Sequence, residues 1–382
     1  MRFIPYGHQS IDDEDIQSVI EVLKGDWLTT GPTVDRFEQE LAKYVDARHA
    51  VAVNSGTSAL DIAVQALALP KGSEIITTPF TFAATGNAIL YNGHNPIFAD
   101  IDPATRNIDP DQIRRRITSR TRAIIYVDYA GHPCAIDEIG DIAQEYDLRL
   151  IEDACHALGA SYDGRKIGTF ADMTIFSFHP VKPITTGEGG AVVTENAELA
   201  AKLRMLRSHG ITRDIGHMFG EGASWGYDMQ YLGRNYRMTD IQAALGLSQL
   251  RKISSFIQRR NEIAALYTRV LSDLEWLELP STLEHVTHGW HLYTVLLKGV
   301  DRNALFSYLK ERGIGANVHY IPTYKFSYYQ KHYPQDVTSF PGVEDVFNRI
   351  LTLPLYPDMT DEDVWYISEN LHEVASDLRI PV

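Results

Sequence analysis

Short apolar runs alternate with amphipathic segments along the first 240 residues of the chain. Several runs are rich in β-branched residues and lack strict polar alternation, which is typical of strands covered on both faces. The pattern predicts an α/β domain with a mostly parallel sheet. The expected strands are Ala50–Val53, Glu74–Thr78, Pro96–Ala99, Arg122–Asp128, Leu148–Asp153, Met173–Phe178 and Ala191–Thr194, and the expected helices cover residues 57–68, 82–92, 109–118, 135–146 and 196–207.

Two amphipathic helices are predicted before the first strand. Residues 12–24 repeat apolar positions at helical spacing, with acidic residues in the first turn and Gly25 as the expected C-cap. A second helix is expected to begin at Thr33 as its N-cap. Its buried face would hold Val34, Phe37, Leu41 and Tyr44.

The pattern changes after about residue 240, where a long helix is predicted from Asp240 to about Leu274. We therefore expect a large α/β domain over residues 1–250 and a small α+β domain over residues 251–382, with the boundary inside that helix. The expected later elements are a strand at His291–Leu297, a helix at Arg302–Arg312, a strand at Ile314–His319, an aromatic loop at Tyr320–Tyr333 and a last helix from Asp361.

Composition narrows the classes of partner. The 382 residues carry a net charge of −15, which argues against nucleic acid or an anionic membrane as a main partner. Only two cysteines, Cys134 and Cys155, are present, so a secreted disulfide framework is not expected. No apolar run approaches the roughly 18 residues that span a bilayer, and no signal-peptide pattern opens the chain. We expect a cytoplasmic protein.

One lysine, Lys182, stands between an apolar strand and a loop with three glycines. A partly desolvated pocket lowers the pKa of such a lysine, so its neutral amine can bind an aldehyde cofactor as a Schiff base. Ser177 places a hydroxyl where it could meet a phosphate. His179 is compatible with tuning the lysine and, equally, with a passive role. The segment therefore indicates pyridoxal phosphate.

Asn54-Ser55-Gly56-Thr57-Ser58-Ala59 lies between a predicted strand and a predicted helix. Its glycine, hydroxyls and first-turn amides could bind an anion at the helix N-terminus. An ordinary N-cap without a ligand explains the same residues. Phe82, in a later connection, could lie flat against a pyridine ring, although a core phenylalanine is an equal alternative.

Asp153 ends an apolar strand, at the edge where open α/β sheets bind ligands. An acid there can pair with the protonated ring nitrogen of pyridoxal phosphate, or it can be a solvated acid at a strand end. His156 could stack on the ring or hydrogen-bond to it, and a structural histidine is the alternative.

Other chemistries find weak support. His285, His288 and His291 have a spacing that chance explains, and no His-x-x-x-His pair accompanies a carboxylate, so no metal site is expected. No Gly-x-Ser-x-Gly elbow occurs. Gly187-Glu188-Gly189-Gly190 is no dinucleotide fingerprint, which argues against a nicotinamide enzyme. The aromatic loop Tyr320–Tyr333 could stack on a base or sugar, or could be a packed loop.

Four motifs occur together and in order: Asn-Ser-Gly-Thr at 54–57, Glu-Asp at 152–153, Ser-Phe-His-x-x-Lys at 177–182 and Gly-x-Asn-Tyr-Arg-Met at 233–238. In this the chain resembles the DegT-type sugar aminotransferases, which are fold-type I pyridoxal phosphate enzymes, from Tyr6 to about residue 375. The presence of Lys182, where dehydratase members have histidine, favours transamination.

The resemblance implies roles for individual residues and a homodimer with two shared sites. Lys182 would be the Schiff-base lysine and proton shuttle, and Asp153 would pair with the pyridine nitrogen. Many members carry Gln at the position of His156, which leaves its place near the cofactor's phenolic oxygen open. The other implied cofactor contacts are Gly56, Thr57, Ser58 and Ser177 at the phosphate, Phe82 against the ring, and Asn235 at the phosphate of the neighbouring subunit.

Within the family, segments such as Val127–Gly131, Leu206–Gly210 and Val318–Pro322 resemble the aminotransferases of the pseudaminic acid pathway. That resemblance implies transfer of an amino group from glutamate, through a pyridoxamine phosphate form, to C4 of a UDP-linked 4-keto-6-deoxy-N-acetylhexosamine. A dTDP- or GDP-linked sugar, reaction at C3, and a non-catalytic regulator remain alternatives. The residues implied around the nucleotide sugar are Tyr6, Asp26, Trp27, Leu28, Thr29, His319 and Tyr320.

Overall fold

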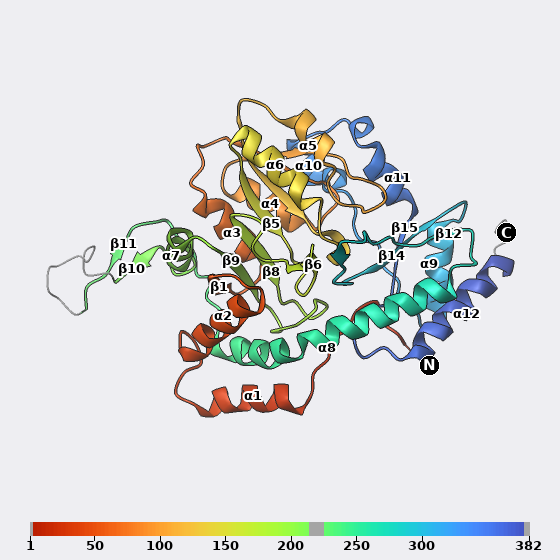
Figure 1. The fold of residues 1–382 in the computed structure, drawn as a ribbon, viewed down its shortest axis with the longest axis horizontal. Coiled ribbons are helices and arrows are strands. Elements are labelled where there is room, and N and C mark those ends of the chain that lie inside the picture. The colour runs from red at the N-terminus through yellow and green to blue at the C-terminus, as the bar shows by residue number, and fades with distance from the viewer. Residues whose placement is uncertain (1–2, 214–224, 378–382) are drawn as a thin grey trace.

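The computed structural model describes residues 3–213 and 225–377, whose centre is a seven-stranded sheet (Figure 1). Only β9 among the sheet strands runs antiparallel to its neighbours, so the predicted mostly parallel sheet is confirmed. The strands follow the order β1 (His49–Val53), β9 (Gly190–Thr194), β8 (Met173–Ser177), β5 (Arg149–Asp153), β4 (Thr121–Val127), β2 (Glu74–Thr77) and β3 (Asn95–Phe98).

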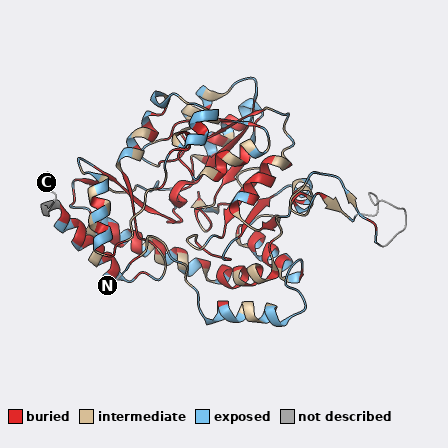
Figure 2. Cartoon of the chain, turned by 180° about the vertical axis from the view of Figure 1, so that it is seen from behind, coloured by how far each residue is buried: buried red, intermediate tan, exposed pale blue. Residues whose placement is uncertain are grey.

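Alternate residues of the strands enter two different cores, so both faces of the sheet are covered and buried (Figure 2). Val51 and Val53 pack on one face, and Ala50 and Ala52 pack on the other. This explains why the strand runs show no polar alternation. One face is covered by α3 (Gly56–Ala66), α4 (Ala83–Tyr91) and α7 (Ala197–Leu206), and the other by α2 (Pro32–Tyr44), α5 (Pro110–Arg116) and α6 (Ile136–Tyr146).

The helix α8 (Asp240–Val270) joins the sheet to a second core. Thr239 and Gln242 form a capping box at its N-terminus, and Asp240 caps α2 by accepting from the amides of Gly31 and Thr33. The predicted N-cap of α2, Thr33, is therefore wrong: Gly31 is the N-cap residue, and a carboxylate from α8 replaces the missing side-chain cap. Helix α1 (Asp13–Lys24) has Asp12 as its N-cap residue and Gly25 as its C-cap residue, and the predicted C-cap is confirmed.

The C-terminal core lies against the second half of α8, where Ile263 belongs to it while Ile257 still belongs to the sheet core. The boundary expected between residues 250 and 251 falls within this continuous helix, and the division into two domains stays a prediction. This part contains β12 (Leu277–Glu278), β14 (Tyr293–Leu297), β15 (Ile350–Leu353), α9 (Arg302–Glu311), α10 (Ser327–His332), α11 (Pro341–Arg349) and α12 (Asp361–Asp377).

One predicted strand is wrong. Residues 314–319 make only isolated bridges, from Ile314 to Ile4 and from Asn317 to Thr352. β14 instead lies between β12 and β15, and β15 is a short buried run that follows a helix without a turn signal. Short strands not predicted are β6 (Ser161–Tyr162), β7 (Arg165–Lys166), β13 (Val286–Thr287), β10 (Ile211–Thr212) and β11 (Asp228–Met229).

Candidate active site

The loop between β8 and β9 places Lys182 at the carboxyl edge of the parallel strands. Ser177 pairs with Gly190 across the two strands, so the loop is closed at its base. Inside it, the Lys182 amide donates to the His179 carbonyl at 2.9 Å. An open α/β sheet binds ligands at this edge, so the observed position of Lys182 agrees with the prediction.

The Lys182 side chain is half-buried, and burial lowers its pKa to about 8, although Cys155 and Asp153 oppose the shift. At neutral pH about a tenth of such an amine is neutral, against less than about a thousandth for an ordinary lysine. Its Nζ lies 3.4 Å from Nε2 of His291. The site therefore contains an amine prepared for attack on a carbonyl.

Asp153, the last residue of β5, is buried at the same edge. Its Oδ2 accepts a 2.7 Å hydrogen bond from the hydroxyl of Thr85 on α4, and Oδ1 accepts from the Cys155 amide at 3.3 Å. The charge of Asp153 raises the pKa of Lys182, so the two residues belong to one site. Thr85 was not predicted from the sequence and orients this carboxylate.

His156 is buried beside them, and burial lowers its pKa well below the usual range. Its Nδ1 accepts from the Ala130 amide at 3.2 Å, and Nε2 lies 3.1 Å from the Tyr320 hydroxyl. Since Nδ1 is an acceptor, the neutral ring carries its proton on Nε2 and donates to Tyr320. His156 therefore links the lysine site to the aromatic loop.

The N-terminus of α3 lies against the lysine loop. A Cβ at Gly56 would lie 2.9 Å from the Ser177 Cβ, so only glycine fits this approach. The Ser58 amide donates to the Ser55 side chain at 3.0 Å, and the Ser58 hydroxyl donates to Asn54. This leaves the amides of Gly56 and Thr57 as the first-turn donors for an anion.

Aromatic side chains form one side of the site. Phe82 is 60% exposed, which excludes the alternative of a core phenylalanine. Its ring lies 6.1 Å from that of Tyr320, and the Tyr6 ring lies 5.2 Å from that of His319. The predicted residues Tyr6, His319 and Tyr320 are thus brought together near Lys182, whose charge acts on His319.

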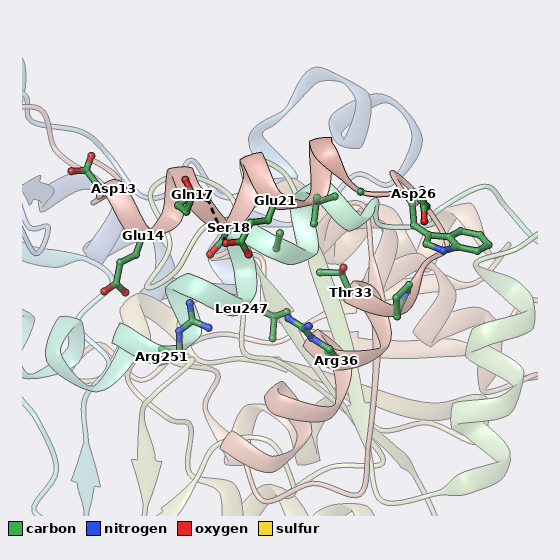
Figure 3. A pocket seen from close by; sticks show the side chains of 15 residues that line it. Asp13, Glu14, Gln17, Ser18, Glu21, Asp26, Thr33, Arg36, Leu247 and Arg251 are labelled. Atoms are coloured by element: carbon green, nitrogen blue, oxygen red, sulfur yellow. Dashed lines mark hydrogen bonds between the residues drawn. The ribbon is translucent and has the colours of Figure 1, made fainter.

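Other predicted residues lie elsewhere in this chain. Asp26–Thr29 form an exposed turn at the N-terminal end of α8, where the Asp240 amide donates to the Leu28 carbonyl. Asp26 and Trp27 line a cavity of about 650 Å³ between α1, α2 and α8, with Arg36 and Arg251 opposite the acidic face of α1 (Figure 3). Asn235 is exposed and bridges to Ser208.

His291 is a site residue that the sequence did not reveal. It lies just before β14, 4.4 Å from the His156 ring and within reach of Lys182. The three histidines, His285, His288 and His291, are evenly spaced in the sequence. The spacing therefore did not indicate that His291 is the one that contacts Lys182.

Within residues 3–213 and 225–377, no group of three metal-ligating side chains is placed to bind an ion. No helix in the same residues is both long enough and apolar enough to cross a membrane.

Two further acids are buried near the same strand ends: Asp128, which follows β4, and Glu152, which lies in β5. Oδ2 of Asp128 and Oε1 of Glu152 have no hydrogen-bond partner among the described residues. Burial raises the pKa of Glu152 to about 7 and that of Asp128 well above its usual value. Because the charge of Glu152 also raises the pKa of Asp128, the two acids titrate as a pair.

We expect Glu152→Gln to change the pH dependence of stability. Since the pKa of Glu152 is higher in the folded state, its contribution is greatest below its unfolded value near 4.5 and declines as pH rises through about 7. The variant should therefore gain about 1–3 kcal/mol relative to the native protein between pH 5 and pH 8. Thermal unfolding of the variant and of the native protein at pH 5 and at pH 8 measures this difference in stability, and the exposed Glu138→Gln is the control. A difference that is the same at both pH values would contradict the prediction.

The comparisons with known proteins cover nearly the whole chain. Residues 9–372 match the DegT/DnrJ/EryC1/StrS aminotransferase family. Spore coat polysaccharide biosynthesis protein SpsC of Bacillus subtilis is 41% identical (98% of this chain, 97% of that protein). UDP-4-amino-4,6-dideoxy-N-acetyl-β-L-altrosamine transaminase of Campylobacter jejuni is 38% identical, with 98% of each chain covered.

Solved structures agree over the same length. PseC of Helicobacter pylori, an aminotransferase of pseudaminic acid biosynthesis, superposes with a TM-score of 0.92 at 34% identity, covering 97% of this chain and 99% of that one. The PLP form of the sugar aminotransferase Spr1654 of Streptococcus pneumoniae superposes with a TM-score of 0.91 at 31% identity, covering 98% and 99%. The predicted fold class is confirmed, and the chain belongs to the DegT/DnrJ/EryC1/StrS aminotransferase family.

Proposed function

We propose that this enzyme transfers an amino group from glutamate to C4 of a UDP-linked 4-keto-6-deoxy-N-acetylhexosamine, within nucleotide-sugar biosynthesis. The full-length similarity to the Campylobacter jejuni transaminase supports this substrate most directly. As a family member the chain is a pyridoxal phosphate-dependent sugar aminotransferase, as predicted. The cytoplasmic location stays a prediction.

The residues present fit pyridoxal phosphate. The close approach of Gly56 to Ser177 forms a cradle that a Cβ would fill, beside free first-turn amides of α3. Asp153 would face the ring nitrogen, and the exposed Phe82 would lie against the ring. When bound, the cofactor accepts the amino group and withdraws electrons into its ring.

We assign the proton transfers to Lys182. Its Nζ would hold the cofactor through the aldehyde carbon, and the free amine would take a proton from that carbon and deliver it to C4 of the sugar. A pKa near 8 allows the amine to accept and return that proton close to neutral pH. Asp153 would keep a positive charge on the ring nitrogen, since its buried carboxylate lies at the same sheet edge as Lys182 and Thr85 orients it.

We place the nucleotide sugar along Tyr6, His319 and Tyr320, which offer stacking faces beside Lys182. Asp26–Thr29 and Asn235 are exposed; Leu28 accepts from the first residue of α8, and Asn235 pairs with Ser208. We infer a homodimer in which each of these segments approaches the site of the second subunit. Size-exclusion chromatography with light scattering tests this assembly.

The greater identity to SpsC favours a second candidate, an aminotransferase for another nucleotide-linked keto-sugar, with dTDP or GDP or with reaction at C3. We expect the purified enzyme with glutamate to convert the UDP-linked 4-keto sugar at a kcat/KM at least about tenfold above the dTDP- and GDP-linked sugars. NMR of the product shows the position and configuration of the new amine. Preference for another nucleotide, or an amine at C3, would replace the first proposal with the second.

A further inference from the structure

His291 is held beside Lys182 from two directions. Its backbone amide donates to the Ala130 carbonyl at 2.9 Å, and its ring packs 4.4 Å from that of His156. The side chain is only 4% exposed, and its Nε2 lies 3.4 Å from the lysine Nζ. The ring therefore has a single orientation toward the amine.

The hydrogen-bond partners of the His291 ring indicate which of its nitrogens carries the proton. A lysine ammonium has donors only, so Nε2 of His291 must accept from it. The neutral ring then carries its proton on Nδ1, an atom that is buried and has no partner among the described residues. A buried donor is left unpaired at a cost, and the hydrogen bond that Nε2 accepts from the charged amine opposes that cost.

We propose that His291 is a positioning residue for Lys182: its unprotonated Nε2 accepts a hydrogen bond from Nζ whenever the amine is not bonded to the cofactor. The contact would keep the released amine at the reacting carbons while it moves the proton. This inference rests on the proposed role of Lys182 and is independent of which sugar the enzyme uses.

A neutral acceptor suits this position. Among the groups that face Lys182, Asp153 already supplies an anion, and a second carboxylate would keep the amine charged. A neutral imidazole orients the amine with a weaker effect on its charge. The titratable groups around the amine are Asp153, Cys155 and His156 after β5, His319 before the aromatic loop, His179 in the lysine loop, and His291 itself.

The test compares His291→Gln with His291→Asn. The glutamine amide reaches the place of Nε2 and supplies an acceptor there, whereas the asparagine amide reaches only the place of Nδ1. The rate at which cofactor-free protein takes up pyridoxal phosphate, followed by visible absorbance across pH, reports the pKa of Lys182. We expect glutamine to leave this pKa close to the native value, and asparagine to lower it by about half to one unit.

His288 provides the control, because it is also buried but stacks on Trp290 at 3.8 Å and accepts from the Trp290 amide. His288→Asn should lower the melting temperature without shifting the lysine titration. If His291→Asn does not fold, His291→Met replaces it, since methionine has similar reach and no strong acceptor. The proposal is overturned if the variants with and without the acceptor titrate alike. No sugar enters this assay, so an error in the assigned substrate would leave its result unchanged.

Discussion

Lys182→Ala is expected to lower the rate of amino transfer by at least about a thousandfold, because in the proposed mechanism one side chain both binds the cofactor and moves the proton. The fold should survive the change. Burial lowers the pKa of this amine, which means that its charged form is disfavoured in the folded protein. Alanine removes that cost, so we expect the cofactor-free variant to melt at or above the temperature of the cofactor-free native protein.

Two measurements check this prediction. Borohydride reduction followed by peptide mass spectrometry should place the cofactor on Lys182 in the native protein and on no lysine in the variant. Lys202→Ala is the matched control, since Lys202 also has a partly desolvated amine, which donates to the Ala66 carbonyl on α3. A variant at Lys182 that still carries covalent cofactor and converts keto-sugar would refute the assignment.

Asp153→Asn is expected to produce the second largest loss, about a hundred- to a thousandfold in kcat. The amide oxygen can still accept from Thr85, so the geometry changes little while the charge is lost. Because Asp153 also raises the pKa of Lys182, the variant should take up cofactor at lower pH than the native protein.

Glu152→Gln is the control for this charge, since it neutralises the neighbouring residue of β5 without facing the lysine. It should retain nearly native kcat. Equal losses in the two variants would show that β5 needs both acids for its structure, and that the proposed role of Asp153 at the ring nitrogen is wrong.

The sheet and the position of Lys182 and Asp153 were predictable because they depend on local patterns. Apolar runs define the strands, and the carboxyl ends of parallel strands meet at one edge. The strand Ile350–Leu353 and the role of His291 depend on which distant segments meet. The periodicity of the sequence does not predict that β14 pairs with β15. It also does not predict that His291, and not His288, contacts Lys182.

The position of Asp26–Thr29 relative to Tyr6 and His319 could not be predicted, for a different reason. Both groups were expected around one nucleotide sugar, yet the structure places the first in an exposed turn near the start of α8. Motifs along a chain indicate which residues serve a site, but in the homodimer proposed above they would not show which subunit supplies each residue.

The antiparallel direction of β9 limits how the catalytic lysine can move. Consecutive parallel strands would need a long crossover, whereas residues 178–189 leave β8 and return directly beside it, with Ser177 opposite Gly190. The segment is therefore closed at its base by the pairing of two strands, and this closure holds Lys182 beside the carboxyl ends of the parallel strands. An insertion between Ser177 and Lys182 would lengthen the path from β8 to the amine, and so would move the amine without changing any reacting group.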